Sequence, residues 1–267
     1  MNILVCAKQV PDTTEIKIDP VTNTLIRDGV PSVLNPYDGY ALEAAARLKD
    51  ADPSINIVVM TMGPEAAKAV SKECLAIAAD KAYLVSGRSF AGSDTLATSY
   101  ILQNAVKEIE KTEGHFDFIF CGKQAIDGDT AQVGPEMAEW LGYGQITNGL
   151  ECELKDGKLE VLKEGADGNL VLSIAAPAVV TFTKPSFDPR FPTIKRKMAA
   201  NKAEIAVLGD GFNPDMDETK IGLKGSPTFV RKSFTPPVAE GGEILKAETP
   251  EDTVKLLVEK LTASHVI

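Results

Sequence analysis

Glycines and short polar side chains gather in the stretch FIFCGKQAIDGDTAQVGPEMAEWLG, residues 118–142. Its apolar start predicts a strand over 117–121, and its later periodicity predicts a helix over about 131–141. Helix N-termini at such junctions bind anions, because their first N–H groups lack helical partners and the peptide dipoles add roughly half a positive charge. Gly122, Gly128 and Gly134 would let a ligand reach the backbone. The stretch therefore predicts a nucleotide site, with a well-capped loop that binds nothing as the alternative.

The standard phosphate-binding fingerprints are absent from this sequence. The first apolar run continues as CAKQVPD, without G-x-G-x-x-G, and Gly122-Lys123 is followed by Gln124 where a Walker motif needs Ser or Thr. Asp127 and Asp129 would repel a phosphate lying against them. They fit better as partners of ribose hydroxyls or as helix caps, which leaves phosphates to backbone N–H groups and Thr130.

A second candidate is Asn35-Pro36-Tyr37-Asp38, where Asn is a good helix N-cap and Pro suits the first helical position. Capping is the preferred interpretation. The position after the first strand also places these residues near the carboxyl edge of a sheet, where α/β proteins bind ligands. Cys6, Cys74 and Cys121 lie in apolar runs and are expected to pack, not to act as nucleophiles.

Composition limits the classes of function. The chain has 267 residues and a formal net charge of −10, which argues against a duplex nucleic acid partner. No apolar run approaches the roughly 20 residues that span a bilayer, so membrane insertion is not expected. The start MNILVCAKQV resembles a strand and lacks the features of a secretion signal, so we expect a cytoplasmic protein. Two histidines and four scattered cysteines offer no metal site or His-based triad.

Strand and helix patterns alternate through residue 141, which predicts an α/β fold: a Rossmann-like, doubly wound, mostly parallel sheet. The expected strands are 2–7, 55–62, 82–85 and 117–121, and the expected helices include 36–51 and one capped by Ser93 or Asp94. Residues 16–26 suggest a small hairpin at the margin of the sheet, after a turn at Val10-Pro11-Asp12. Residues 146–183 are expected to add antiparallel strands, 184–197 to form an exposed loop and 205–208 a last strand.

The C-terminal part has a different character. Glycine, proline and charge dominate residues 209–248, and Thr249-Pro250-Glu251-Asp252 then begins a helix. Val254, Leu257, Val258 and Leu261 follow at helical spacing, so this helix should bury one face against a partner. We expect a nucleotide-binding α/β domain over 1–235 and a docking arm with its helix over 236–267.

Over nearly its whole length the sequence resembles the β subunit of electron-transfer flavoproteins. The match is carried by VCAKQVPDT, LNPYDGYALEAA, VVMTMGP, CGKQAIDGDTAQVGPEMAEWLG and PAVVTFTKPSFDPRFPTIKRKMA. The resemblance implies an α-subunit partner with its own FAD, on which the C-terminal arm would dock. It also implies that this chain holds AMP in ordinary members, or the AMP portion of a second FAD in electron-bifurcating members.

By matched position, the resemblance implies nucleotide contacts from Cys6, Asn35, Pro36, Tyr37, Asp38, Met62, Gly122, Lys123, Gln124, Ala125, Ile126, Asp127, Gly128, Asp129, Thr130, Ala131, Gln132 and Val133. It also implies a loop around Ile194 that inserts an apolar side chain into a partner dehydrogenase, with Lys195 and Arg196 beside it. Other members of the family commonly have leucine at the position of Ile194. The docking role is therefore expected here too, but the identity of the partner dehydrogenase stays open.

The segments KQVPDTTEIKID, DGDTAQVGP and DTLATS are similar to the bifurcating subgroup, and DTLATS adds Thr95 and Thr98 as pyrophosphate candidates. This subgroup implies FAD as cofactor and NADH as electron donor. One electron would pass to ferredoxin or flavodoxin, and the other through the α-subunit FAD to an acyl-CoA dehydrogenase or reductase. Two alternatives stay open: a passive electron carrier with structural AMP, and a nucleotide-sensing or adenylyl-transferring protein on a similar fold.

Overall fold

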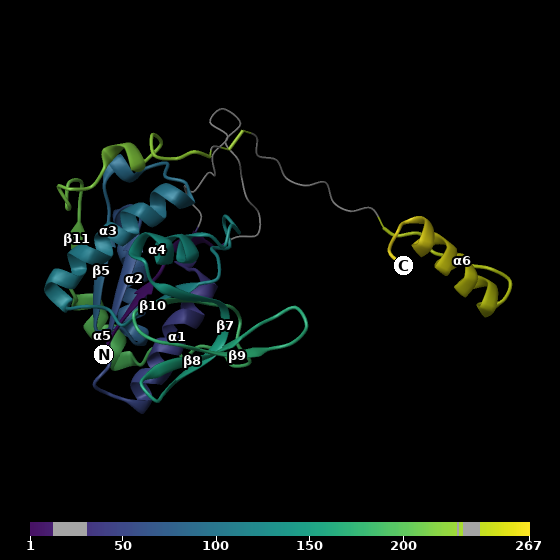
Figure 1. Ribbon diagram of the computed structural model, residues 1–267, viewed down its shortest axis with the longest axis horizontal. Helices are drawn as coiled ribbons and strands as arrows, with labels where there is room; N and C mark the ends of the chain where they lie inside the picture. The colour runs from purple at the N-terminus through teal and green to yellow at the C-terminus, as the bar shows by residue number, and fades with distance from the viewer. Residues whose placement is uncertain (13–30, 229, 232–240) are drawn as a thin grey trace. The chain divides into compact units, whose positions relative to one another are not determined.

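The computed structural model describes residues 1–12, 31–228, 230–231 and 241–267. The chain divides into two compact units, Met1–Arg231 and Lys232–Ile267. The first unit is built on a nine-stranded sheet with the order β11-β5-β4-β1-β6-β10-β7-β8-β9 (Figure 1). Its strands are β1 (Asn2–Cys6), β4 (Asn56–Met62), β5 (Lys81–Val85), β6 (Phe118–Gly122), β7 (Gly144–Lys155), β8 (Lys158–Lys163), β9 (Leu170–Ile174), β10 (Ala178–Phe182) and β11 (Ala206–Leu208).

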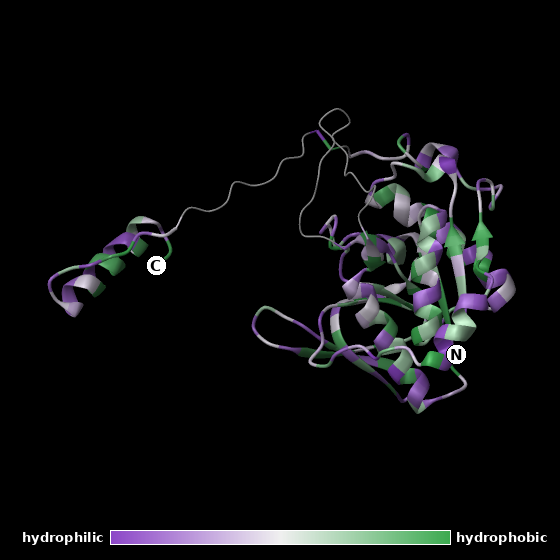
Figure 2. Ribbon diagram, turned by 180° about the vertical axis from the view of Figure 1, so that it is seen from behind, coloured by the Kyte–Doolittle hydropathy of each residue, from purple (hydrophilic) through white to green (hydrophobic). Residues whose placement is uncertain are grey.

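Helices cover both faces of this sheet. They are α1 (Pro36–Ala51), α2 (Lys68–Ile77), α3 (Thr95–Glu113), α4 (Val133–Leu141) and α5 (Ile194–Lys202), with short 3-10 turns at η1 (Glu65–Ala67), η2 (Arg88–Phe90) and η3 (Glu218–Lys220). Side chains alternate along a strand, so Ile3 and Val5 of β1 join the core under α1 and α2 while Leu4 joins the core under α3 and α4. The strands β1, β4, β6 and β10 are buried along most of their length, as expected when helices cover both faces, and Figure 2 shows hydrophobic colour in the strands between the helices.

The sheet changes winding direction at β1. The chain runs from β1 outward through β4 and β5, then returns to place β6 on the other side of β1, and β4, β1 and β6 are all parallel. The carboxyl ends of β1 and β6 therefore open at a topological switch point, where ligands of doubly wound sheets bind. The predicted mostly parallel α/β fold is confirmed.

The region after residue 143 differs in part from the prediction. β8 and β9 are antiparallel additions, as expected, but β10 lies between β6 and β7 and is parallel to both. All five residues of β10, AVVTF, are buried. A continuous apolar run of this kind is typical of a central parallel strand, so the sequence carried this signal.

Two local predictions at the start of the chain have different outcomes. Val10 and Pro11 belong to β2 (Gln9–Pro11), which pairs with β3 (Ser32–Leu34) in a separate antiparallel sheet, so the predicted turn there is wrong. Val10 is buried, which favours the strand. The predicted hairpin over 16–26 lies outside the described residues.

The second unit contains the predicted amphipathic helix, α6 (Pro250–Ala263). Thr249 caps it by accepting a hydrogen bond from the backbone N–H of Asp252. Val254, Leu257 and Val258 are exposed along one side, where Figure 2 shows hydrophobic colour beside hydrophilic. None of the helices in the described ranges has the length and apolar character needed to cross a membrane.

Candidate functional site

Asp38, in the first turn of α1, connects the two strands at the switch point. Its carboxylate accepts hydrogen bonds from the backbone N–H of Lys8 at 2.7 Å and of Gly122 at 3.0 Å. Lys8 follows β1 and Gly122 ends β6, so one buried side chain holds the ends of both strands against α1. This arrangement makes Asp38 a positioning residue of the predicted nucleotide loop.

Asn35 has a different role from the predicted helix cap. Within the described part of the chain its side chain makes no capping hydrogen bond to α1. The side chain is fully buried and reaches the nucleotide loop, where Nδ2 donates to the carbonyl oxygen of Gln124 at 2.8 Å and Oδ1 accepts from the N–H of Ile126 at 3.2 Å. Asn35 does occupy the predicted N-cap position, but the predicted side-chain cap is wrong, because the asparagine amide supplies the donor and the acceptor that this loop needs. Pro36 does occupy the first helical position.

Close packing explains the glycine at position 122. A Cβ there would lie 2.7 Å from the Cβ of Tyr37 and 2.8 Å from the backbone nitrogen of Asp38, besides striking the Asp38 carboxylate. The N-terminus of α1 therefore approaches β6 as closely as a glycine allows. Gly134, in α4, similarly packs on Thr181 of β10.

The loop after β6 is closed across the switch point by an ion pair. Lys8 Nζ lies 2.7 Å from Asp127 Oδ1, and the Asp127 side chain is 7% exposed. A turn forms the loop's tip, where the carbonyl oxygen of Ala125 accepts from the N–H groups of Gly128 and Asp129. Gln124 then donates to the Asp129 carboxylate at 2.7 Å. The backbone N–H of Lys123 donates to Phe182 of β10.

The end of the loop carries unusual backbone. Asp129 and Ala131 have φ of 52° and 54°, in the left-handed region that costs a residue with a Cβ roughly 1–2 kcal/mol. Strained residues concentrate at ligand sites, and successive residues of opposite hand turn their N–H groups toward a common point. Gln132, the next residue, has right-handed φ and ψ and precedes α4. The geometry suits a bound anion.

The first turn of α4 offers backbone donors to such an anion. Among the described residues no side chain caps it, although Asp94 caps α3 with a hydrogen bond from Ala97. Thr95, the first residue of α3, lies beside the start of α4, with Oγ1 3.3 Å from the Gln132 side-chain oxygen. Thr98 is one turn further along α3. Thr130, Ala131 and Gln132 are exposed, and Val133 is half-buried.

Cys6 and Met62 end β1 and β4 and lie half-buried at the same edge of the sheet. The Cys121 thiol of β6 lies beside Cys6. A hydrogen bond with the Cys6 thiol, together with burial, raises the pKa of Cys121 well above its ordinary value. All four cysteines are free thiols in the structure. A protonated, buried thiol is a poor nucleophile, which agrees with the packing role predicted for Cys121.

Asp38 leads to a prediction on pH. Burial, which outweighs the hydrogen bonds from Lys8, Asn35 and Gly122, raises the pKa of Asp38 from 3.8 to about 7. Between pH 4 and 7 the unfolded chain has lost this proton while the folded chain keeps it, so the free energy of unfolding falls as pH rises, by at most about 4 kcal/mol from this group. Above pH 7 the contribution is constant.

Asp38→Asn should remove this contribution. Urea unfolding of both proteins at intervals from pH 4.5 to 7.5 should show a flatter pH dependence for the variant. The two proteins differ in one titrating group, so subtracting the curves isolates Asp38. Parallel curves would contradict the assignment.

Residues 194–196, predicted to dock a partner within an exposed loop, begin a helix. Thr193 caps α5 by accepting from the N–H of Arg196, so the predicted loop ends at 193 and the helix covers Ile194–Lys202. The Thr193 hydroxyl was an available signal that the three preceding prolines hid. Ile194 and Lys195 are exposed, whereas the Arg196 guanidinium donates to carbonyl oxygens at the end of α2.

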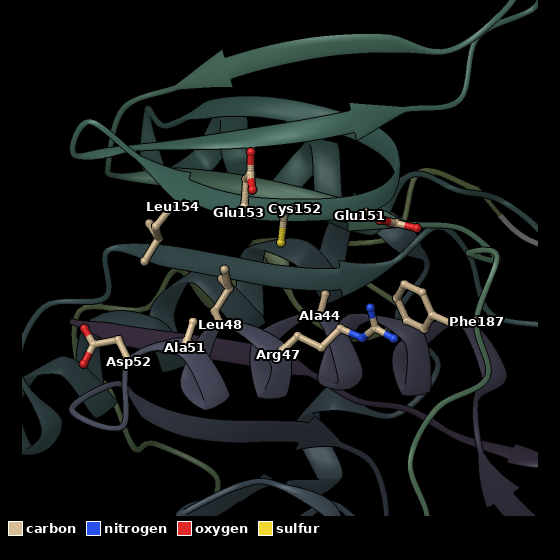
Figure 3. A pocket seen from close by; sticks show the side chains of 10 residues that line it. All are labelled: Ala44, Arg47, Leu48, Ala51, Asp52, Glu151, Cys152, Glu153, Leu154 and Phe187. Atoms are coloured by element: carbon tan, nitrogen blue, oxygen red, sulfur yellow. The ribbon is translucent and has the colours of Figure 1, made fainter.

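A cavity of about 500 Å³ lies between α1 and β7 (Figure 3). Its described lining comes from Ala44, Arg47, Leu48, Ala51, Asp52, Glu151, Cys152, Glu153, Leu154 and Phe187. These residues are not among those predicted for the nucleotide. The geometry of the switch-point loop makes it the candidate site, and the cavity is a separate feature beside the loop that precedes α5.

Sequence reasoning missed Lys8 as part of the site. Lys8 directly follows a buried strand and begins the polar exit KQVPD. A lysine at the carboxyl end of the first strand was a usable signal, because in doubly wound sheets this end of the strand lies at the crevice that binds ligands. Its pairing with Asp127, 119 residues later, was not visible in the sequence.

Comparison with known proteins identifies the family of this chain. Residues 22–210 match the model of the electron transfer flavoprotein domain. Over its full length the chain is 50% identical to the electron transfer flavoprotein subunit beta of Megasphaera elsdenii, and 44% identical to the caffeyl-CoA reductase-Etf complex subunit CarD of Acetobacterium woodii; both of those proteins are also covered in full. Protein FixA of Azorhizobium caulinodans is 42% identical over 88% of this chain and 85% of its own length. The chain therefore belongs to the electron transfer flavoprotein family, in which it takes the place of the β subunit.

Proposed function

We propose that this β subunit holds an FAD by its adenosine and phosphate end at the switch point between β1 and β6. The observation that carries the proposal is the junction of the loop after β6 with α4. There, two left-handed residues, Asp129 and Ala131, lead into a helix start that has no side-chain cap within the described chain. Backbone N–H groups in that arrangement fit phosphate oxygens, and the exposed Thr130 adds a hydroxyl.

The predicted contact residues then take two kinds of role. The Asn35 side chain bonds the loop, and the Asp38 side chain bonds the ends of β1 and β6. These two residues would therefore shape the pocket without contacting the nucleotide through these groups. Ile126, Asp129 and the exposed residues up to Gln132 would face the nucleotide, with Thr95 and Thr98 toward the pyrophosphate. Asp127, paired with Lys8, would hold the loop over the crevice.

The same proposal assigns the protein to electron bifurcation. A bound FAD supplies hydride acceptance from NADH and transfer of single electrons. The protein's part is to orient the cofactor and exclude water. Electrons would leave to ferredoxin or flavodoxin and, through the α-subunit FAD, to an acyl-CoA dehydrogenase or reductase. The 44% identity to a subunit of a caffeyl-CoA reductase-Etf complex supports this assignment.

Docking of the dehydrogenase at Ile194 and Lys195, and docking of residues 236–267 on the α subunit, belong to this proposal. So does the cytoplasmic location expected from the sequence. Family membership gives the nucleotide-sensing and adenylyl-transferring alternative no support.

The flavin content of the purified αβ heterodimer tests the function. We expect two FAD per heterodimer, a visible spectrum that NADH bleaches, and ferredoxin-dependent NADH oxidation with an acyl-CoA substrate. One FAD and one AMP per heterodimer, without NADH oxidation, would replace this function by that of a passive carrier with structural AMP. Perchloric acid extraction followed by chromatography counts both nucleotides in one sample.

A further inference from the structure

The segment between β10 and α5 is fixed to the domain although it contains neither helix nor strand over residues 183–193. Ser186 donates to the Glu151 carboxylate of β7 at 3.0 Å. The centre of the Phe187 ring lies 3.3 Å from the Arg47 guanidinium carbon, and the ring forms one side of the cavity beside α1 (Figure 3). These contacts hold the first half of the segment against β7 and α1.

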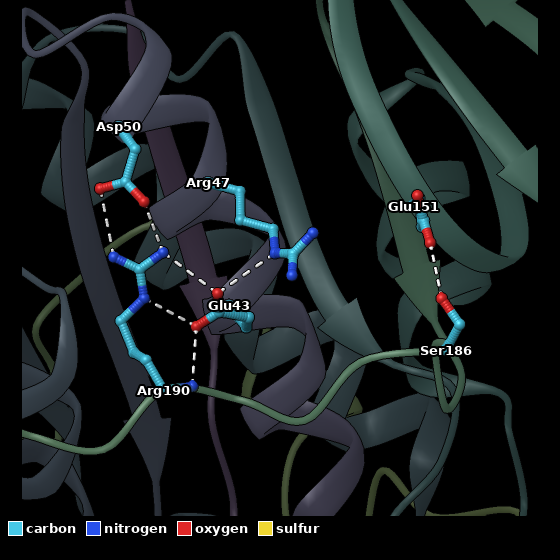
Figure 4. A network of polar contacts seen from close by, with 6 residues as sticks. All are labelled: Glu43, Arg47, Asp50, Glu151, Ser186 and Arg190. Atoms are coloured by element: carbon cyan, nitrogen blue, oxygen red, sulfur yellow. Dashed lines mark hydrogen bonds and ion pairs between the residues drawn. The ribbon is translucent and has the colours of Figure 1, made fainter.

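Arg190 makes the densest set of contacts in the segment (Figure 4). Its backbone N–H and Nε both donate to Glu43 Oε2, at 3.1 and 2.8 Å, and Nη2 donates to Glu43 Oε1 at 3.1 Å. Nη1 and Nη2 also donate to the two oxygens of Asp50 at 3.2 and 2.7 Å. Glu43 and Asp50 are two turns apart on α1, so the planar guanidinium clamps the segment to one helix face.

The electrostatics agree with a permanent clamp. The Glu43 side chain is 5% exposed, so loss of Arg190 would leave a buried carboxylate whose remaining cation, within the described ranges, is Arg47. Hydrogen bonds to Glu43 and Asp50 raise the pKa of Arg190 above its ordinary value, and Arg190 in turn lowers the pKa of Asp50. The guanidinium is charged throughout the physiological range.

Arg196 anchors the other end of the segment. Its guanidinium donates to the carbonyl oxygens of Leu75 and Ala79 at 2.9 Å and of Ala76 at 3.2 Å. These carbonyls lie at the C-terminal end of α2, where a helix has unpaired acceptors and partial negative charge. A cation placed there is favourable and ties the start of α5 to α2.

Between the two arginines the apolar side chains point outward. Phe191 is 92% exposed and Ile194 81% exposed, and beyond Arg196 the Met198 side chain of α5 is exposed as well. Free apolar side chains in a loose loop would fold back onto the domain. The clamps on either side explain why these remain in solvent.

We propose that Arg190 and Arg196 are positioning residues that hold Phe191 and Ile194 in the conformation in which they contact the partner flavin dehydrogenase. This inference rests on the proposed docking role of Ile194, and adds Phe191 as a second apolar contact. An ordered loop loses less conformational entropy on binding than a free loop, so preorganisation raises affinity without any new contact. The expected signature is a change in KM for the dehydrogenase, with kcat nearly unchanged.

The test uses the αβ heterodimer with purified acyl-CoA dehydrogenase as the varied substrate. Arg190→Ala is expected to raise KM for the dehydrogenase about tenfold, with kcat within about twofold and unchanged flavin content. Arg190→Lys should recover part of the loss, because one ammonium cannot bond both carboxylates. Lys49→Ala is the matched control, since it removes another α1 ion pair, with Asp80, and should leave KM unchanged.

Hydrogen exchange reports on the loop itself. In Arg190→Ala, amide protons of the peptide covering 184–199 should exchange at least tenfold faster, while peptides from β1 and β6 keep their protection. This readout also reveals whether the variant has unfolded as a whole. Unchanged exchange in 184–199 would overturn the clamp.

Ile194→Asp separates this inference from the docking role. If Ile194→Asp raises KM and Arg190→Ala does not, docking stands and the positioning role is overturned. If neither variant changes KM, the docking role and the positioning role are both wrong. A rise in KM in both, with fast exchange only in Arg190→Ala, is the expected result.

Discussion

Gly122→Ala is expected to empty the nucleotide site and to destabilise the α/β unit by about 1–3 kcal/mol, the usual cost of overpacking. The added methyl would lie 2.8 Å from the backbone nitrogen of Asp38, and no side-chain rotation can relieve that overlap. α1 must then move away from β6, which breaks the hydrogen bond from Gly122 to Asp38 and the contacts of Asn35 with Gln124 and Ile126. The loop would lose the support that fixes its shape.

Gly209→Ala, in the same α/β unit but outside the nucleotide loop, is the matched control. A Cβ at Gly209 would approach the carbonyl oxygen of Ser86 at 3.8 Å, an ordinary contact distance. Its stability should therefore stay within about 0.5 kcal/mol of the wild type, the range of surface substitutions. Urea unfolding gives the free energies, and nucleotide retained by the heterodimer after gel filtration gives occupancy. Equal behaviour of the two variants would show that close packing of α1 on β6 does not shape the site.

The sequence predicted the sheet well because local pattern and burial agree there. β1, β4, β5 and β6 are apolar runs bounded by polar turns. Gly122 was expected to let a ligand reach the backbone, whereas the structure packs Tyr37 and Asp38 of α1 against it. Asn35 was misjudged because Asn-Pro is a good helix start by itself. Its actual partners, Gln124 and Ile126, are about 90 residues away in sequence. Local rules cannot identify bonds of that separation.

The docking segment shows the same limit. Its exposed apolar residues could be assigned from resemblance, but the clamp between Arg190 and α1 joins residues 140 and 147 positions apart. Arg196, predicted to dock, bonds α2 carbonyls about 120 residues earlier. In a sequence, basic residues near an exposed apolar residue are consistent with docking a partner or with anchoring the segment to its own domain. Only the contacts in the structure decide between these two roles.

α1 joins the proposed nucleotide site to the proposed docking segment. Its first turn carries Asp38, which holds the ends of β1 and β6, and its later turns carry Glu43 and Asp50, which hold Arg190. These residues span 12 positions, or about 18 Å of helix at 1.5 Å per residue. In the proposed function, a rigid helix of that length would fix the distance between a bound cofactor and the docking residues, a distance on which the rate of electron transfer depends.

Deletion of residues 236–267 is expected to abolish or strongly weaken association with the α subunit while Met1–Arg231 stays folded. The compact unit Met1–Arg231 contains the whole nine-stranded sheet and both cores. α6 has 14 residues, a length at which an isolated helix is marginal in water, so its exposed apolar side needs a partner surface. Co-purification of the truncated chain with a tagged α subunit, and circular dichroism of the truncated chain alone, measure the two effects.

A double substitution on α6 sharpens this prediction, because it leaves the chain length unchanged. Leu257→Asp with Val258→Asp places two charges on the exposed apolar side, where burial would cost several kcal/mol. Association should weaken by at least about a hundredfold, roughly 2.7 kcal/mol. Glu259→Lys, about 140° around the helix from Val254, changes charge by two units on the polar side and should leave association intact. A heterodimer that elutes unchanged with the double variant would exclude α6 from the interface, and loss of binding by truncation alone would then point to the arm that precedes the helix.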